Sequence, residues 1–379
     1  MKQIRILVLT ACVCFVSGAW GQQPTADQRK SHWAEFHRQN MMRWNPNETV
    51  LSVQDVGGLS QKWKFFLGLF GIATSVIEAN GVVYTNFEGG IYELYALDAR
   101  TGATLWHYPQ CCAYSAAAVT NGVVYVGHAS GVWALEAKTG TLLWDYEAGT
   151  YVESSPVVAN GVVYFGSADT NVYALNASSG ALLWSYATGS GVSSSPAVVN
   201  GVVYVGSYDN NVYALNAATG SLLWSYATGD GVFSSPAVAN GTVYVGSNDG
   251  NVYALNAANG ALLWSYVTGG SVSSSPAVAN GVVYIGSTDG KMYALNAGNG
   301  ALLWSYLTRA SVGGSPAVAN GVLYFGSDYM YALNATTGAR LWTAHDTQAV
   351  PGTAIVAHGM VYFYGYTKLL AFGLTTGAD

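Results

Sequence analysis

Short runs in which apolar and polar positions alternate recur along most of this chain. Within residues 161–200 they fall at 162–166, 172–176, 182–186 and 196–199. Alternation with a period of two is typical of half-buried strands, and none of these runs has the 3–4-residue apolar spacing of an amphipathic helix. The pattern therefore predicts four short strands in this part of the chain.

The same pattern restarts at Gly201, Gly241, Gly281 and Gly321, which gives a repeat of 40 residues. An Asn-Gly dipeptide, such as Asn200-Gly201, separates each copy from the next and suits a two-residue turn with positive φ at both positions. Four antiparallel strands in each repeat are typical of the blade of a β-propeller.

A tryptophan that follows leucine in the third apolar run, such as Trp184, allows the blades to be counted. It recurs as Trp106, Trp144, Trp184, Trp224, Trp264, Trp304 and Trp342. An eighth unit, 353–377, lacks this strand, whereas 59–66 supplies a similar run with Trp63. We therefore expect an all-β, eight-bladed propeller of four-stranded antiparallel blades, closed by an N-terminal strand that completes the last blade and removes its open edge. We expect each tryptophan to be buried between blades.

The stretch from Ala96 to Trp106 reads Ala-Leu-Asp-Ala-Arg-Thr-Gly-Ala-Thr-Leu-Trp. It resembles the tryptophan-docking motif of the pyrroloquinoline quinone (PQQ) repeat propellers, although most later blades carry Asn where this copy has Asp98. Arg43 to Thr49 resembles the lead-in segment of many secreted members. The resemblance covers about 45–379 and implies the fold. It implies two classes of function, because the family includes PQQ-dependent alcohol dehydrogenases and the non-catalytic lipoprotein propeller of the outer-membrane barrel-assembly machinery.

The N-terminus has the features of a secretory signal. A basic start with Lys2 and Arg5 precedes a short apolar run and the small-residue site Ala19-Trp20-Gly21. We expect a signal peptide at 1–21, a polar segment at 22–50 that lies over the propeller or stays mobile, and the propeller at 51–379. The predicted location is the periplasm or the exterior. A lipobox-like run ending at Cys12 makes lipoprotein anchoring the less favoured alternative, and no transmembrane span is expected.

Charge narrows the choice of partners. The chain carries 14 Lys and Arg against 20 Asp and Glu, a net charge of −6, and only 9% of its residues are charged. Removal of Lys2 and Arg5 with the signal gives 12 − 20 = −8. This balance argues against nucleic acid as a partner. We expect a monomer that binds an unknown protein or small molecule.

Strand order places the Asn-Gly and Thr-Gly turns on one face and two sets of loops on the other, and loops on a rigid scaffold carry most binding sites. The aspartates of the recurrent Gly-Ser-x-Asp loop either cap their own turns, which we favour, or form a ring that holds a cation. Asymmetric chemistry needs residues that break the repeat. On the loop face these are Glu88, Cys111, Cys112, His128, Tyr151, Glu153, Tyr208, Asp230, Phe233 and Arg309.

Adjacent cysteines at 111 and 112 are the only two that remain after signal removal, and an even count in an exported chain favours a disulfide, here within a strained eight-membered ring. A structural staple or two free thiols are the alternatives. The resemblance implies more, because PQQ dehydrogenases carry a vicinal disulfide over the quinone at this stage of the repeat. In that interpretation Cys111 and Cys112 bind PQQ, Glu153 or Asp169 holds Ca²⁺, and Arg309 meets a quinone carboxylate.

Two functions follow. The first is an exported PQQ-repeat propeller that acts as a binding scaffold for a ligand or a protein. The alternative is a PQQ- and calcium-dependent alcohol or sugar dehydrogenase, for which the sequence identifies no catalytic residue. Other enzyme motifs, such as a nucleophile elbow or a His-Glu-x-x-His zinc site, are absent from the sequence.

Overall fold

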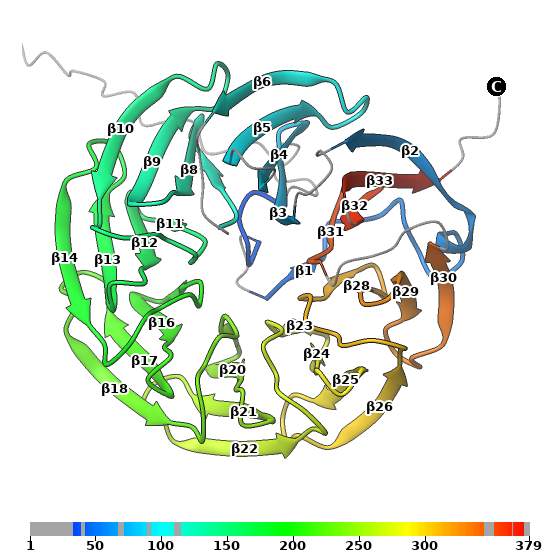
Figure 1. Ribbon diagram of the computed structural model, residues 1–379. Helices are drawn as coiled ribbons and strands as arrows, with labels where there is room; N and C mark the ends of the chain where they lie inside the picture. The colour runs from blue at the N-terminus through cyan, green and yellow to red at the C-terminus, as the bar shows by residue number, and fades with distance from the viewer. Residues whose placement is uncertain are drawn as a thin grey trace, which may run out of the picture. The chain divides into compact units, whose positions relative to one another are not determined.

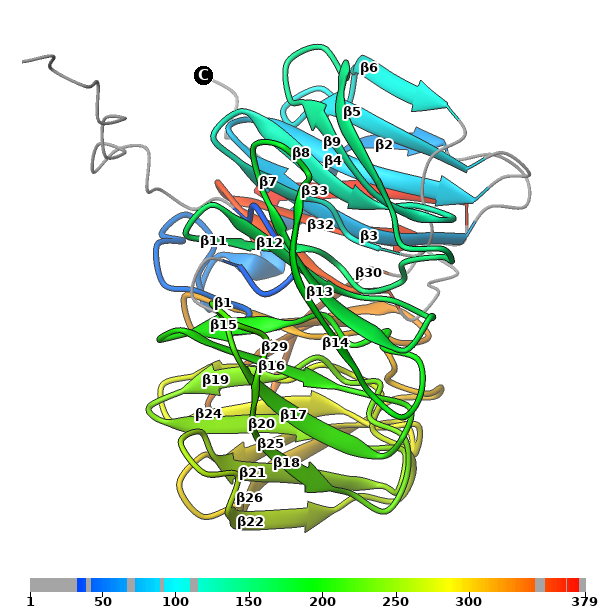
Figure 2. The ribbon, with the colours of Figure 1, turned by 90° about the vertical axis from the view of Figure 1, so that its left-hand side faces the viewer.

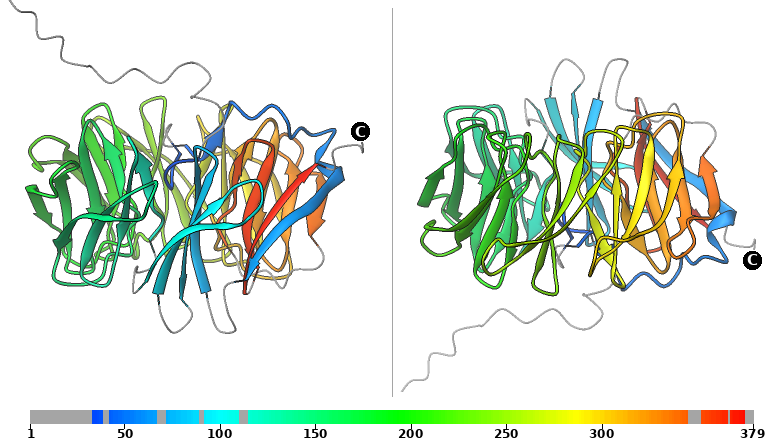
Figure 3. Two further views of the ribbon diagram at one scale, coloured as in Figure 1. Left: turned by 90° about the horizontal axis from the view of Figure 1, so that it is seen from above. Right: turned by 90° about the horizontal axis from the view of Figure 1, so that it is seen from below.

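The strands form eight separate antiparallel sheets arranged in a ring, as the computed structural model shows (Figure 1). The structure describes residues 33–38, 42–66, 72–88, 92–109, 115–344, 352–365 and 367–374. They belong to one unit, 31–379. Seen edge-on, the sheets stand side by side around the ring (Figures 2 and 3). The predicted eight-bladed, all-β propeller is confirmed.

In blades one to seven the strands run from the inner to the outer edge in chain order. The inner strand has three residues in every blade except blade one, where β3 has eight. The strands of blades one to four are β3 (Ile72–Ala79), β4 (Val82–Glu88), β5 (Tyr92–Asp98), β6 (Thr104–Pro109); β7 (Ala118–Thr120), β8 (Val123–Gly127), β9 (Gly131–Glu136), β10 (Leu142–Glu147); β11 (Val157–Ala159), β12 (Val162–Gly166), β13 (Asn171–Asn176), β14 (Leu182–Ala187); and β15 (Ala197–Val199), β16 (Val202–Gly206), β17 (Asn211–Asn216), β18 (Leu222–Ala227).

The strands of blades five to eight are β19 (Ala237–Ala239), β20 (Thr242–Gly246), β21 (Asn251–Asn256), β22 (Leu262–Val267); β23 (Ala277–Ala279), β24 (Val282–Gly286), β25 (Lys291–Asn296), β26 (Leu302–Leu307); β27 (Ala317–Ala319), β28 (Val322–Gly326), β29 (Met330–Asn334), β30 (Arg340–Ala344); and β31 (Ile355–Ala357), β32 (Met360–Gly365), β33 (Lys368–Leu374). Among the described residues the only helix is a 3₁₀ turn, η1 (Val56–Gly58). No helix in this part of the chain is long and apolar enough to cross a membrane.

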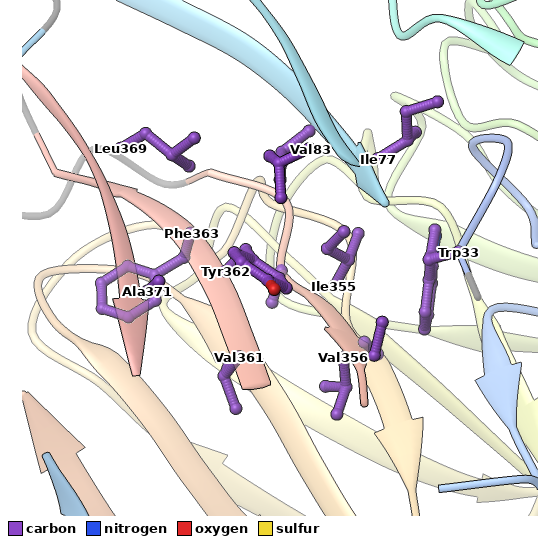
Figure 4. Close-up of a cluster of buried hydrophobic side chains, with 14 of the residues drawn as sticks. Trp33, Ile77, Val83, Ile355, Val356, Val361, Tyr362, Phe363, Leu369 and Ala371 are labelled. Atoms are coloured by element: carbon purple, nitrogen blue, oxygen red, sulfur yellow. The ribbon is translucent and has the colours of Figure 1, made fainter. Parts of the chain in front are cut away.

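Closure of the ring follows the prediction. Strand β2 (Leu59–Phe66) pairs antiparallel with β33 and becomes the outer strand of blade eight, with Trp63 opposite Ala371. Side chains of blades one and eight, such as Val83 and Tyr362, then form one core (Figure 4). Every described Asn-Gly turn between the first two strands of a blade, and the equivalent His358-Gly359, has positive φ at both residues, as expected.

The tryptophans fasten each blade to the next. Trp184 donates its indole N–H to the carbonyl of Ala217 at 2.9 Å, and its ring lies where a side chain on Gly220 would stand. A β-bulge at Leu183 precedes it, so Leu182 and Leu183 both face solvent. The prediction of burial is confirmed for Trp63, Trp184, Trp224 and Trp264. It is wrong in degree for Trp106, Trp144, Trp304 and Trp342, which are only partly buried.

Much of the described N-terminal polar segment does not lie over the propeller. Residues 33–38 and 42–45, which we call the axial segment, run through the centre of the ring (Figure 1). Their backbone pairs with the innermost strands: Trp33 with Glu78 of β3, for example, and Met42 with Val278 of β23. β1 (Trp44–Asn45) adds a parallel fifth strand to blade seven through β27. The inner strands have a free edge with unpaired backbone N–H and C=O groups, and the axial segment forms hydrogen bonds with some of these groups.

Arg43 explains how a polar segment can occupy the core. Its guanidinium is fully buried and donates to the carbonyls of Phe36, Pro316, Ser315 and Ala354 at 2.7–3.4 Å. These donors supply carbonyls that the ends of the inner strands leave without partners, and charge-assisted hydrogen bonds of this kind are the stronger ones. Arg43 therefore ties the axial segment to blades seven and eight.

Candidate functional site

The two faces of the ring differ as the strand order predicts. The turn face carries the short connections, 160–161 and 177–181 in blade three. The loop face carries the Gly-Ser-x-Asp loops, 167–170, and the connections between blades, 188–196. The repeat-breaking residues that the structure describes belong to the second face.

The recurrent aspartates cap their own loops. Asp209 accepts the N–H of Asn211 at 3.0 Å and the hydroxyl of Tyr213 at 2.7 Å, and it also accepts the N–H of Gly189 from the preceding connection. Burial opposes ionisation, but these hydrogen bonds hold the pKa of Asp209 below its usual range. Asp169 binds Asn171 and Tyr173 in the same way. The favoured interpretation is confirmed: these carboxylates are occupied by the fold.

Four repeat-breaking residues converge on the loop face across blades three to five. They are Tyr151, Glu153, Tyr208 and Phe233, and we call them the Tyr208 cluster. The rings of Tyr208 and Phe233 lie 4.1 Å apart between centroids, tilted by 30°. The Tyr208 hydroxyl donates to Oε2 of Glu153 at 3.3 Å. Tyr151 and Phe233 are 47% and 37% exposed, so the cluster presents aromatic surface to solvent.

Electrostatics fix the protonation state of this cluster. Burial and, to a lesser degree, the Glu153 carboxylate raise the pKa of Tyr208 to about 12. The phenol is therefore neutral at physiological pH and remains a hydrogen-bond donor to Glu153. The cluster can offer a partner one carboxylate beside two aromatic faces.

The regular blades show that the fold does not require this cluster. The position of Tyr208 is Ala168 in blade three and Asn248 in blade five, and that of Phe233 is Ser193 and Ser273 in the connections on either side. The strands of these blades have equivalent bounds and registers. The aromatic side chains are additions to a scaffold that forms without them.

His128, also singled out by sequence, has a structural environment. Its ring stacks on Trp133 at 4.3 Å, and Nε2 contacts Asp145 at 3.1 Å. Burial lowers its pKa in spite of Asp145. Sequence reasoning missed Glu35 and His37 in the axial segment, where burial raises the pKa of Glu35 to about 8 and lowers that of His37 to about 3. Their position shortly before Arg43, in the segment that precedes the first blade, is the one sequence feature that could have indicated them.

The residues assigned to a quinone site are only partly described by the structure. Cys111 and Cys112 lie outside the described residues, as does the signal at 1–21. Arg309 is exposed between blades six and seven, whereas Glu153 precedes blade three, four blades away on an eight-bladed ring. Within the described ranges no three His, Cys, Asp or Glu side chains could hold a metal ion. The roles of Cys111, Cys112, Glu153, Asp169 and Arg309 at a quinone and calcium site stay predictions.

Comparison with known proteins supports both branches of the resemblance. A quinohemoprotein alcohol dehydrogenase, ADH-IIG of Pseudomonas putida, is 29% identical over 163 residues, which are 38% of this chain and 22% of that enzyme's length. The solved structure of that enzyme superimposes with a TM-score of 0.81 at 19% identity, covering 94% of this chain and 82% of the enzyme. The structure of BamB from Moraxella catarrhalis gives 0.68 at 20% identity, covering 85% and 99%.

At those identities the structural likeness shows the fold alone. The sequence profile described as outer membrane protein assembly factor BamB is more informative, because it matches residues 92–195 and 168–379. Since this match extends well beyond half of its length, the chain belongs to the outer membrane protein assembly factor BamB family.

Proposed function

We propose that this chain is an exported propeller that acts as a binding scaffold and holds a protein partner at the Tyr208 cluster. The observation that carries the proposal is the convergence of side chains that the regular copies lack at one place on the loop face. Aromatic residues on a rigid scaffold contribute most of the binding energy at many protein interfaces. The family description names an assembly factor, and assembly proceeds through protein partners.

The chemistry of the cluster favours a particular kind of partner segment. Exposed aromatic faces attract the guanidinium of arginine or the ammonium of lysine through their quadrupole. Glu153 adds a carboxylate at the edge of the Tyr208 ring, and the chain as a whole carries a net charge of −6. We therefore expect a segment that presents a basic side chain beside an apolar one. Export would follow from the signal-like residues 1–21.

A photocrosslinking amino acid in place of Phe233 tests the proposal in cells. The matched control carries the same amino acid at Ser273, the equivalent position in the next connection. We expect a crosslinked partner at 233 and none at 273. The purified partner should then bind Tyr208→Asn/Phe233→Ser at least about tenfold more weakly, because a central aromatic anchor typically contributes more than this factor. Equal crosslinking at both positions, or equal affinity, would exclude the cluster as the contact surface.

The dehydrogenase alternative is tested on the same protein. Purified protein is mixed with PQQ and Ca²⁺, freed of excess, and examined for a quinone absorption band and for dye-linked alcohol oxidation. If the protein retains the quinone and oxidises alcohol, and if Cys111→Ser/Cys112→Ser abolishes this oxidation, the dehydrogenase hypothesis replaces the scaffold hypothesis. If the protein retains no quinone after the excess is removed, the result supports the scaffold hypothesis.

A further inference from the structure

A pocket of about 760 Å³ opens on the turn face where blades eight and one meet, far along the chain from the Tyr208 cluster. Met360 of β32 forms an apolar wall, and Tyr362, which is 1% exposed, packs behind it between the two blades (Figure 4). Lys62 of β2 and Arg100, which follows β5, also line it. Its volume lies within the range of small-molecule sites, about 300–1,000 Å³.

The other blade junctions provide an internal comparison. At this one, Trp63 and Tyr362 both donate to the carbonyl of Ala99, and at the junction of blades three and four Trp184 and Tyr164 do the same to Ala217. The correspondence places Lys62 where the regular junction has Leu183, and Arg100 where it has Ala218. His358 likewise replaces Asn160, with the same positive φ.

Charge is concentrated at this junction in a chain that has little of it. Five consecutive junctions, from blades two and three to blades six and seven, have no ionisable residue at the positions of Lys62, Asp98, Arg100 and His358. Since those junctions close with the same tryptophan contacts, docking of one blade on the next does not need these charges.

Two of the four ionisable residues have partners in the fold. Asp98 accepts the N–H of Arg100 and both the N–H and hydroxyl of Thr101, within its own turn. His358 faces the buried carboxylate of Glu78 at 3.2 Å. Lys62 and Arg100 remain, and neither forms an ion pair with a residue that the structure describes. The pocket thus has two cations beside an apolar wall, and the one carboxylate that also lines it, that of Asp98, is held by the hydrogen bonds of its own turn.

We propose that this pocket binds a small organic carboxylate, whose charged group meets Lys62 and Arg100 and whose carbon body lies on Met360. The guanidinium of Arg100 matches the planar geometry of a carboxylate, and lysine adds a mobile point charge. The site is independent of the loop face and needs no metal or quinone.

Isothermal titration of the whole protein with 2-naphthoate, a flat aryl carboxylate, tests the proposal. The test variant is Lys62→Leu/Arg100→Ala, which installs the residues of the regular junctions and so should keep its fold; its melting temperature confirms this. The matched control is Lys138→Ala, since Lys138 occupies the position of Arg100 at the neighbouring junction and does not line the pocket.

We expect saturable binding to the native chain and to Lys138→Ala, and affinity at least about tenfold lower in the double variant, because the loss of both charge-assisted contacts weakens a carboxylate strongly. The neutral 2-naphthamide should bind the native chain as weakly as naphthoate binds the double variant. Absence of saturation at millimolar naphthoate, equal affinity of the double variant, or equal affinity for the amide would each overturn the proposal.

Discussion

Replacement of Trp224 by alanine tests the contact on which the ring depends. Trp224 is 8% exposed and lies between blades four and five. Its indole N–H donates to the carbonyl of Ala257 at 3.0 Å, its ring stands where a side chain on Gly260 would clash, and Tyr204 lies 5.9 Å away between ring centroids. Alanine removes all three contacts and leaves the carbonyl of Ala257 with the hydroxyl of Tyr204 as its side-chain donor.

The expected cost can be estimated in two ways. Buried tryptophan removes roughly 200 Å² from water, worth about 5 kcal/mol at about 25 cal/mol per Å². Measured truncations of buried aromatics to alanine cost about 3–5 kcal/mol. With an unfolding entropy of about 2.1 cal/mol/K per residue, a unit of this size has roughly 0.7 kcal/mol/K, so a loss of about 4 kcal/mol lowers Tm by about 6 °C.

Calorimetry or circular dichroism of three variants provides the assay. Leu223→Ala is the matched control, because Leu223 is the neighbouring residue of the same strand and is 49% exposed; it should shift Tm by less than about 2 °C. Trp224→Phe keeps a ring but loses the hydrogen bond, worth about 1 kcal/mol, and should fall between the two. If Trp224→Ala melts with Leu223→Ala, docking by this side chain does not stabilise the ring.

Three further predictions concern the centre and the closure of the ring. Glu35→Gln should flatten the pH dependence of the unfolding free energy. The folded pKa of Glu35, about 8, exceeds the ordinary 4.5, so the stability that this residue contributes below about pH 4.5 is lost as pH rises toward 8. Urea unfolding of both proteins at about pH 5 and 8 measures this, and an equal change in unfolding free energy between the two pH values would show that Glu35 is solvated. Arg43→Gln should lower the unfolding free energy by at least about 3 kcal/mol, because buried carbonyls lose charged donors; a smaller loss in urea titration would show that water replaces it. Deletion of 51–66 should expose the edge of β33 and cause aggregation, measured by light scattering; a monodisperse product would contradict closure by β2.

The fold was predictable because its signals are local and repeated. A pattern of a few residues is enough to recognise the Asn-Gly turns, the Leu-Leu-Trp strands and the displaced strand around Trp63. Because the patterns repeat, an element that is ambiguous in one blade can be assigned from the others. The degree of burial was less predictable: Trp106, Trp144 and Trp304 have the same motif as Trp184, but they are only partly buried.

The site was predictable in its members and not in its geometry. Tyr208 and Phe233 stand out because they break a strict repeat, but their contact joins two loops of different blades, and Glu153 comes from a third. Repeat arithmetic does not reveal which way a loop side chain leans. The axial segment was harder still, because a polar stretch with arginine normally lies at the surface, and the demand for its donors comes from inner strands that lie about 270 residues away.

The axial segment also bears on the order in which the protein assembles. Repeats that contact only their neighbours can fold piecewise, each stabilised by the next. Here residues that are synthesised early, such as Arg43 and Asn45, find side-chain hydrogen-bond acceptors in blades seven and eight, which are synthesised last. Contacts of such long sequence separation are slow to form. We therefore expect the axial segment to dock late in folding and to couple the last blades to the first, so that the ring unfolds as one cooperative unit.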